Sequence, residues 1–101
     1  MRKVSIITVN FNQPKVTEDL LKSLAEVNTY PDLEIIVVDN GSKANPVPEW
    51  QQRYPGILPG ILFVRSDLNT GFAGGNNIGL AHATGDYLFL INNDTIGRAH
   101  V

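Results

Sequence analysis

The chain has 101 residues, of which 43% are hydrophobic and 18% charged, and its net charge is −2. This length fits one domain, and the composition is typical of a folded rather than a disordered chain. The charge argues against nucleic acid as a partner, because proteins that bind the phosphate backbone carry an excess of basic residues. The chain has no cysteine, which excludes disulfides, zinc–thiolate sites and thiol chemistry.

The N-terminal stretch is basic at residues 2 and 3 and then apolar only as far as Asn10. Such a stretch is too short for the core of a signal peptide or for a membrane span. We therefore expect a cytoplasmic protein, with peripheral attachment to a membrane as the alternative.

Four apolar runs predict β-strands, at residues 4–9, 33–38, 61–64 and 87–91. The last run is unbroken and passes directly into three polar residues, which is typical of a strand that is buried on both faces. Because all four runs are continuous rather than alternating, we expect an α/β fold with a mostly parallel sheet and helices on both of its faces.

Helices are predicted between these strands. Val16, Leu20, Leu24 and Val27 recur at spacings of four, four and three residues, which gives one apolar helical stripe. A short helix is expected at residues 47–54, and another at 73–83 after a glycine-rich loop. A strand, a helix and a strand in succession predict parallel strands joined by a right-handed crossover.

Candidate site residues follow the predicted strands. Thr8 and Phe11 lie at the end of the first strand, Asp39 closes the second, and Asn93 and Asp94 close the fourth. The carboxyl ends of parallel strands open onto one rim of the sheet, where α/β proteins usually bind their ligands. We therefore expect these residues to converge although they are distant in sequence.

Asp39 has two interpretations. A carboxylate at a strand end can accept hydrogen bonds from a ribose hydroxyl or a base N–H. It can equally cap the turn formed by residues 40–42. A dinucleotide-binding loop is less favoured, because residues 10–14 contain no glycine.

The glycine-rich stretch 71–79 also has two interpretations. Glycines beginning at Gly71 allow backbone N–H groups to approach a phosphate at the N-terminus of a helix, although no Walker sequence is present. The alternative is a plain turn followed by a tight contact between helix and sheet. Asn76 and Asn77 add amides that either bond to phosphate or ribose or cap the helix.

Asp94 is the candidate metal ligand. A diphosphate with one Mg²⁺ or Mn²⁺ needs few protein ligands, because water and phosphate oxygens complete the coordination of the cation. One carboxylate at a strand end is therefore sufficient. The alternative is an ordinary polar end of a strand.

Four segments carry a family resemblance, namely residues 5–12, 37–42, 69–79 and 85–94. In this order and spacing they resemble the nucleotide-binding half of family 2 glycosyltransferases, which have the GT-A fold. The rhamnosyltransferase-like branch is the most similar. The resemblance covers nearly the whole chain.

The resemblance implies a role for each matching residue. Thr8 and Phe11 would line the pocket for the base and ribose, and Asp39 would bond to the base. Asn93 would lie against the ribose or the diphosphate. Asp94 would be the metal carboxylate of the Asp-x-Asp element.

Two positions depart from the pattern of the family. The first acidic residue of the Asp-x-Asp element is Asn92 here, which leaves Asp94 as its only carboxylate. Many relatives have arginine where this chain has Asn76, so a positive charge toward the diphosphate is missing.

The resemblance also implies an activity. A sugar would pass from a UDP- or dTDP-sugar to a hydroxyl of a carbohydrate or lipid-linked acceptor, with inversion and with assistance from the metal. Family members continue well past Asp94, and the continuation supplies the acceptor site and the general base. We therefore expect this chain to be a fragment that binds the donor nucleotide and lacks a general base of its own.

Two alternative functions stay open. A sugar-phosphate nucleotidyltransferase of related fold is less favoured, because such enzymes carry a glycine-rich basic loop after the first strand and residues 10–14 do not. A non-catalytic fragment would instead self-associate, since an exposed strand edge or apolar face favours association.

Overall fold

A computed structural model describes residues 2–27, 32–54 and 60–93. Its elements are β1 (Val4–Asn10), α1 (Pro14–Val27), β2 (Leu33–Asn40), α2 (Val47–Arg53), β3 (Ile61–Ser66), α3 (Gly71–His82) and β4 (Tyr87–Leu90). The strands form one sheet in the order β3-β2-β1-β4, and every pairing is parallel. The predicted parallel α/β architecture is therefore confirmed.

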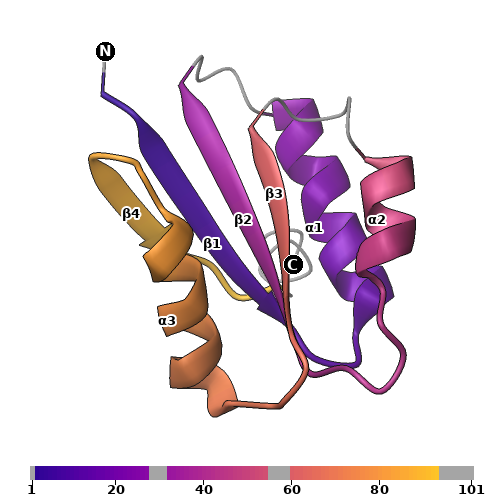
Figure 1. Ribbon diagram of the computed structural model, residues 1–101. Helices are drawn as coiled ribbons and strands as arrows, with labels where there is room; N and C mark the ends of the chain where they lie inside the picture. The colour runs from indigo at the N-terminus through magenta and orange to yellow at the C-terminus, as the bar shows by residue number, and fades with distance from the viewer. Residues whose placement is uncertain (1, 28–31, 55–59, 94–101) are drawn as a thin grey trace.

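Helices cover both faces of this sheet (Figure 1). On one face Ile6 and Ile35 pack with Leu21 of α1 and Trp50 of α2. On the other face the side chains of the next residues along each strand pack beneath α3. Side chains alternate between the two faces of a strand, so both sets of positions in β1 and β2 must be apolar. This explains the continuous apolar runs of these two strands.

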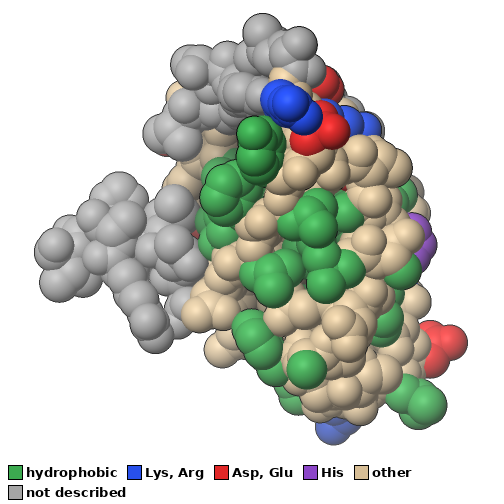
Figure 2. Space-filling view, turned by 90° about the vertical axis from the view of Figure 1, so that its left-hand side faces the viewer, with side chains coloured by type: hydrophobic (Ala, Val, Ile, Leu, Met, Phe, Trp, Pro, Cys, Tyr) green, Lys and Arg blue, Asp and Glu red, His purple; other side chains and the backbone are tan. Residues whose placement is uncertain are grey.

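Strand β4 is different, because it lies at an edge of the sheet and pairs with β1 alone among the described strands. Its four side chains are 49% to 53% exposed, and Figure 2 shows hydrophobic side chains on this side of the molecule. The prediction that this strand is buried on both faces is wrong for the described part of the chain. Helix α3 packs mainly on β1 and β2, which leaves β4 partly uncovered.

The boundaries of the elements differ from the prediction by one or two residues, and two of these differences matter for the site. Helix α3 begins at Gly71, two residues before the expected start at 73, and β3 extends to Ser66 rather than to 64. Both differences place regular structure closer to the rim where β1 and β2 end. Within the described ranges, no helix is long and apolar enough to cross a membrane.

Two glycines bring α3 close to the sheet. Gly75 and Gly79 are buried, and a Cβ at Gly75 would lie 2.8 Å from Val9 Cγ1. A Cβ at Gly79 would overlap Cγ2 of Ile7, which is fully buried. The tight helix–sheet contact considered for this stretch is therefore present.

The opposite rim, at the amino ends of the strands, is organised by Glu34. Its Oε1 accepts hydrogen bonds from Ser5 Oγ at 2.8 Å and from the Thr84 backbone N–H at 2.9 Å, and Lys3 Nζ lies 3.4 Å from Oε2. Burial by itself raises the pKa of Glu34, but these hydrogen bonds and the charge of Lys3 outweigh it. The pKa is therefore lowered from its ordinary value of 4.5.

We expect Gly79→Ala to destabilise the fold. A Gly→Ala change inside a helix gains about 1 kcal/mol. Overpacking against the buried Ile7 should cost more, about 1–3 kcal/mol. Urea unfolding would measure the net loss, and Asn77→Ala, at an exposed position of the same helix, should be neutral or slightly stabilising. Equal or greater stability of Gly79→Ala would contradict the close contact.

We also expect acid to weaken the rim around Glu34. A lowered folded-state pKa means that its contribution is fully present above pH 4.5 and is lost as the pH falls through the folded-state value. Glu34→Gln should cost about 1 kcal/mol at pH 7 and should flatten the stability profile below pH 4.5. Unfolding curves across this range test the sign, and a wild-type and a variant profile of the same shape would refute it.

Candidate functional site

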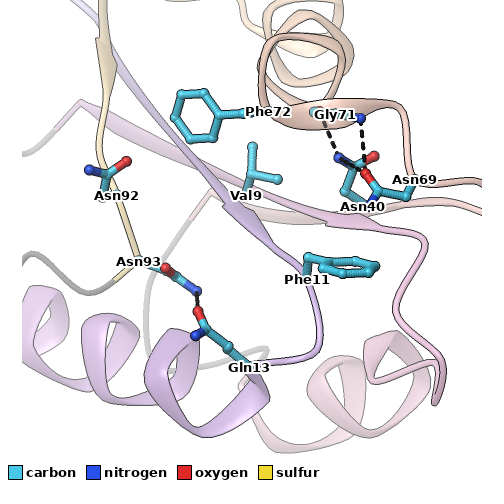
Figure 3. Close-up of a pocket in the computed structure, with 9 residues that line it drawn as sticks. All are labelled: Val9, Phe11, Gln13, Asn40, Asn69, Gly71, Phe72, Asn92 and Asn93. Carbon is cyan, nitrogen blue, oxygen red and sulfur yellow. Dashed lines mark hydrogen bonds between the residues drawn. The ribbon is translucent and has the colours of Figure 1, made fainter.

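A cavity of about 420 Å³ opens at the rim where the carboxyl ends of β1 and β2 meet (Figure 3). It is lined by Val9, Phe11, Gln13, Asn40, Asn69, Gly71, Phe72, Asn92 and Asn93. These residues come from the ends of two strands, the loop before α1, the start of α3 and the segment after β4. This is the position where open α/β sheets bind ligands.

The lining of this cavity is neutral. Among the residues that the structure describes, it consists of amides, two phenylalanines, a valine and a glycine, with no acidic or basic side chain. Phe11 is 43% exposed and Phe72 65% exposed, so both offer ring surface for stacking. Amides can both donate and accept hydrogen bonds. The cavity therefore suits a flat polar ring with attached hydroxyl groups.

Asn40 joins β2 to the loop that leads into α3. Its Nδ2 donates to the Gly71 carbonyl at 2.8 Å and to Asn69 Oδ1 at 3.3 Å. Its Oδ1 accepts from the Thr70 N–H at 3.1 Å and from Thr70 Oγ1 at 2.8 Å. Gly71 has a φ of 79°, which a side chain would strain. One buried amide thus sets the conformation of this wall of the cavity.

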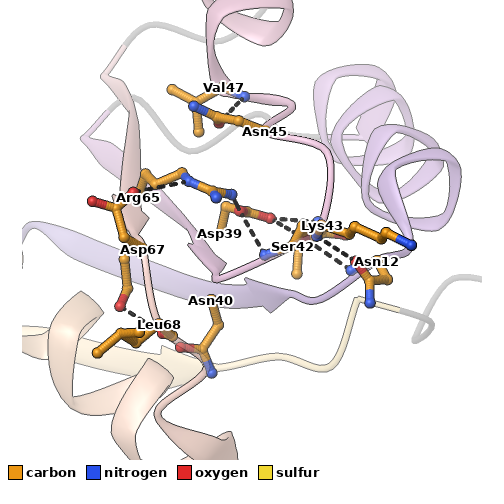
Figure 4. A network of polar contacts seen from close by, with 12 residues as sticks. Asn12, Asp39, Asn40, Ser42, Lys43, Asn45, Val47, Arg65, Asp67 and Leu68 are labelled. Carbon is orange, nitrogen blue, oxygen red and sulfur yellow. Dashed lines mark hydrogen bonds and ion pairs between the residues drawn. The ribbon is translucent and has the colours of Figure 1, made fainter.

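Asp39 lies on the opposite face of the sheet from Asn40 and is fully buried. It accepts a hydrogen bond from Asn10 Nδ2 at 2.9 Å. It also accepts from the N–H and hydroxyl of Ser42 and pairs with Arg65, as Figure 4 shows. A carboxylate has about four acceptor positions, and these four donors occupy them. The alternative in which Asp39 caps the 40–42 turn is therefore present, and its predicted bond to a base stays a prediction.

The other predicted residues separate into two groups. Phe11, Gly71 and Asn93 line the cavity. Thr8 is fully buried on the face of Asp39, and the described residues give its hydroxyl no hydrogen-bond partner. Asn76 is 7% exposed within α3 and is not part of the lining. Asp94 lies outside the described residues.

Asn93 is held by the start of α1. Its Nδ2 donates to Thr17 Oγ1 at 3.1 Å and to Gln13 Oε1 at 3.4 Å. Sequence reasoning did not identify Thr17, Gln13 or Asn40. For Thr17 the available signal was a polar residue inside an otherwise apolar helical stripe, which is unusual unless it is hydrogen-bonded. Gln13 and Asn40 carry no such signal, because Gln13 precedes α1 and Asn40 ends β2 beside another polar residue.

No metal-binding cluster is present in the described part of the chain, where no group of three or more His, Cys, Asp and Glu residues is close enough to hold an ion. The side chains of Asn92 and Asn93 supply amide oxygens at the cavity, and such hard oxygen donors suit Mg²⁺ or Mn²⁺. A cation here would need further oxygen ligands, from a bound ligand or from residues outside the described ranges.

The family model described as Glycosyl transferase family 2 matches residues 5–96. The chain belongs to glycosyltransferase family 2. It is 31% identical, over 91 residues, to a protein of Haemophilus influenzae named "Uncharacterized glycosyltransferase"; the match covers 90% of this chain and 29% of the relative.

Solved structures are also similar to this chain. S. aureus TarS 1–349 in complex with UDP-GlcNAc superposes with a TM-score of 0.79 and 25% identity, covering 97% of this chain and 30% of the TarS 1–349 chain. The mannosyltransferase PcManGT from Pyrobaculum calidifontis, in complex with GDP-Man and Mn²⁺, gives a TM-score of 0.78 and 27% identity, covering 92% of this chain and 28% of PcManGT.

These comparisons establish the GT-A fold that the family resemblance implies. They support an enzyme by family resemblance, since the matching family is one of glycosyltransferases. The chain spans less than a third of the length of each of these three proteins.

We expect Asn40→Asp to loosen the cavity wall. Aspartate keeps the acceptor toward Thr70 but places an oxygen against the Gly71 carbonyl, where Asn40 now donates. Leaving such a buried group unsatisfied costs about 1–3 kcal/mol. Chemical unfolding would measure the loss. Hydrogen exchange at the Gly71 amide should become faster, because its acceptor, Asn69 Oδ1, loses its bond to Asn40 Nδ2.

Asn77→Asp is the matched control, because Asn77 is an exposed residue of α3. It should leave both measurements nearly unchanged. Wild-type exchange at Gly71 in Asn40→Asp would show that the Nδ2 group of Asn40 does not hold the loop.

Proposed function

We propose that this chain is the donor-binding part of an enzyme that transfers a sugar from a UDP- or dTDP-sugar to a hydroxyl of a carbohydrate or lipid-linked acceptor. The observation that carries the proposal is the neutral cavity at the carboxyl rim, lined by aromatic rings and amides. It is supported by the similarity to TarS, solved with UDP-GlcNAc, and to PcManGT, solved with GDP-Man and Mn²⁺.

In this proposal the rings of Phe11 and Phe72 stack with the base. Asn93 hydrogen-bonds to the ribose or the diphosphate. Gly71 and Phe72 begin α3 and also line the cavity, so the N-terminus of this helix adjoins it. A helix N-terminus favours an anion, which suits the diphosphate of the donor. The contacts of Asp39, Thr8 and Asn76 with the donor stay part of the proposal only as the family resemblance implies them, because none of the three lines the described cavity.

A divalent cation, Mg²⁺ or Mn²⁺, is part of the proposal. The described lining has no positive charge with which to meet a diphosphate, and a cation held by Asp94 would provide it. When bound, such an ion stabilises negative charge on the leaving phosphates. Asn92, in place of an acidic residue, leaves Asp94 as the carboxylate of this element.

The proposed reaction is a displacement at the anomeric carbon of the donor sugar. A base removes the proton of the acceptor hydroxyl, and the oxygen then attacks C1. The bond from C1 to the diphosphate oxygen breaks with inversion, and the nucleoside diphosphate leaves with the electron pair. The described lining contains no group that could be the base, so we place the base outside the described residues.

We further propose a rhamnosyltransferase-like subtype and a cytoplasmic location. Peripheral attachment to a membrane is the alternative to a cytoplasmic location.

Thermal unfolding with UDP tests the donor site. We expect UDP with Mn²⁺ or Mg²⁺ to raise Tm by several degrees, because a ligand at 100 times its Kd adds about 2.7 kcal/mol of stability. UDP without metal should protect much less. Asp94→Ala should remove the metal-dependent part of the shift.

Asp19→Ala is the control, because Asp19 is an exposed carboxylate on α1 outside the cavity. It should keep the full shift. Equal protection with and without metal would refute the role of Asp94, and no protection by UDP or dTDP under any condition would refute the donor site.

A further inference from the structure

A buried series of hydrogen bonds connects the end of β2 to the segment after β4. Asn10 Nδ2 donates to Asp39 Oδ1 at 2.9 Å, and Thr17 Oγ1 donates to Asn10 Oδ1 at 2.7 Å. Asn93 Nδ2 then donates to Thr17 Oγ1 at 3.1 Å. The first three of these residues are fully buried. The series therefore runs from one face of the sheet, through helix α1, to the wall of the cavity.

The chemistry of Asp39 imposes one direction on this series. An ionised carboxylate only accepts hydrogen bonds, so the amide of Asn10 must turn its nitrogen toward Asp39. That leaves the oxygen of Asn10 facing Thr17, whose hydroxyl must use its single hydrogen to donate. The hydroxyl of Thr17 then has only acceptor capacity left. Asn93 must therefore turn its own nitrogen toward Thr17.

A contact with Gln13 agrees with this orientation from a second side. Its Oε1 accepts from the same nitrogen of Asn93 at 3.4 Å, and Figure 3 shows the oxygen of Asn93 turned away from Gln13. Asn93 lies in the cavity lining. The amide is thus ordered with its nitrogen used by the protein, and within residues 2–27, 32–54 and 60–93 no donor is bonded to its oxygen.

We propose that Thr17, together with Asn10, is a positioning residue that orients the amide of Asn93 for the ligand. This inference rests on the proposed donor site. An oriented oxygen accepts from a hydroxyl group, such as those of a ribose, and repels a phosphate oxygen, which has no hydrogen to donate. Thr17 touches no ligand in this scheme. It acts by disfavouring the flipped orientation of the Asn93 amide, in which the NH₂ group would face the cavity and the hydrogen bond to Thr17 would be lost.

The first measurement needs no ligand. Hydrogen exchange of the side-chain NH₂ groups can be followed by NMR in ¹⁵N-labelled protein. We expect Thr17→Val, which is nearly isosteric but has no hydroxyl, to accelerate exchange at Asn93 about fivefold, the equivalent of one hydrogen bond. Thr17→Ser keeps the hydroxyl and should retain wild-type exchange. If Thr17→Val does not fold, Thr17→Ala replaces it.

The second measurement compares UDP with 2′,3′-dideoxy-UDP, each with Mn²⁺, by titration calorimetry. The wild type should prefer UDP, because only UDP carries the ribose hydroxyls. Thr17→Val should reduce this preference about fivefold through weaker binding of UDP, since one oriented hydrogen bond is lost. Thr17→Ser should keep the preference. In Asn93→Ala the further change Thr17→Val should have no effect on the preference, because the group that Thr17 orients is gone.

Thr84→Val is the control for the loss of a threonine hydroxyl. Thr84 Oγ1 bonds to Glu34 at the opposite rim, at 3.2–3.3 Å, so this variant should change stability without changing either measurement at Asn93. Unchanged exchange and preference in Thr17→Val would overturn the inference. If the wild type binds neither nucleotide, the proposed donor site fails, and the exchange at Asn93 still decides whether Thr17 orients the amide.

Discussion

The burial of one carboxylate at the end of β2 is the constraint on which this rim of the molecule depends. Asp39 is completely removed from solvent, and a buried charge is tolerated only when its hydrogen bonds are made. Four donors supply them, from Asn10, Arg65 and twice from Ser42. They draw the end of β1, the end of β3 and the turn after β2 together. Because Asp39 can only accept, it also sets the direction of the hydrogen bonds that continue through α1.

Asn40, the next residue of β2, organises the other face of the sheet through its hydrogen bonds. Side chains of successive strand residues point to opposite sides, so Asn40 faces α3 while Asp39 faces α1 and α2. Asn40 holds the loop before α3 through four hydrogen bonds, and the buried glycines of α3 allow that helix to lie close to β1. The cavity lies between these two organised faces, at the carboxyl ends of the strands. Its geometry therefore depends on two adjacent polar residues, of which Asn40 lines the cavity and Asp39 does not.

Individual elements show which structural features the hydrophobic pattern of the sequence predicts and which it does not. The apolar runs located all four strands, because a continuous run of this length is required wherever both faces of a strand are covered. The same pattern was misleading for the run 87–91, because its first four residues form an edge strand with half-exposed side chains. Local sequence cannot distinguish these cases, since exposure depends on which other elements pack there. Likewise, strand ends indicated the correct rim, but whether Asp39 or Asn40 faces the cavity depends on which face of β2 each side chain occupies.

By itself, the sequence determined the fold class, the order of its elements, the rim that carries the site and the membership of a glycosyltransferase family. These properties follow from local periodicity and from motifs in a fixed order. Both are features of the sequence that do not depend on tertiary contacts. Only the tertiary structure decided that Asp39 is enclosed by its own protein, that Asn40 holds the glycine-rich loop and that Thr17 contacts Asn93. Thr17 and Asn93 are 76 positions apart, and no local pattern records a hydrogen bond over such a separation. It exists because the packing of α1 on the sheet brings the two side chains together.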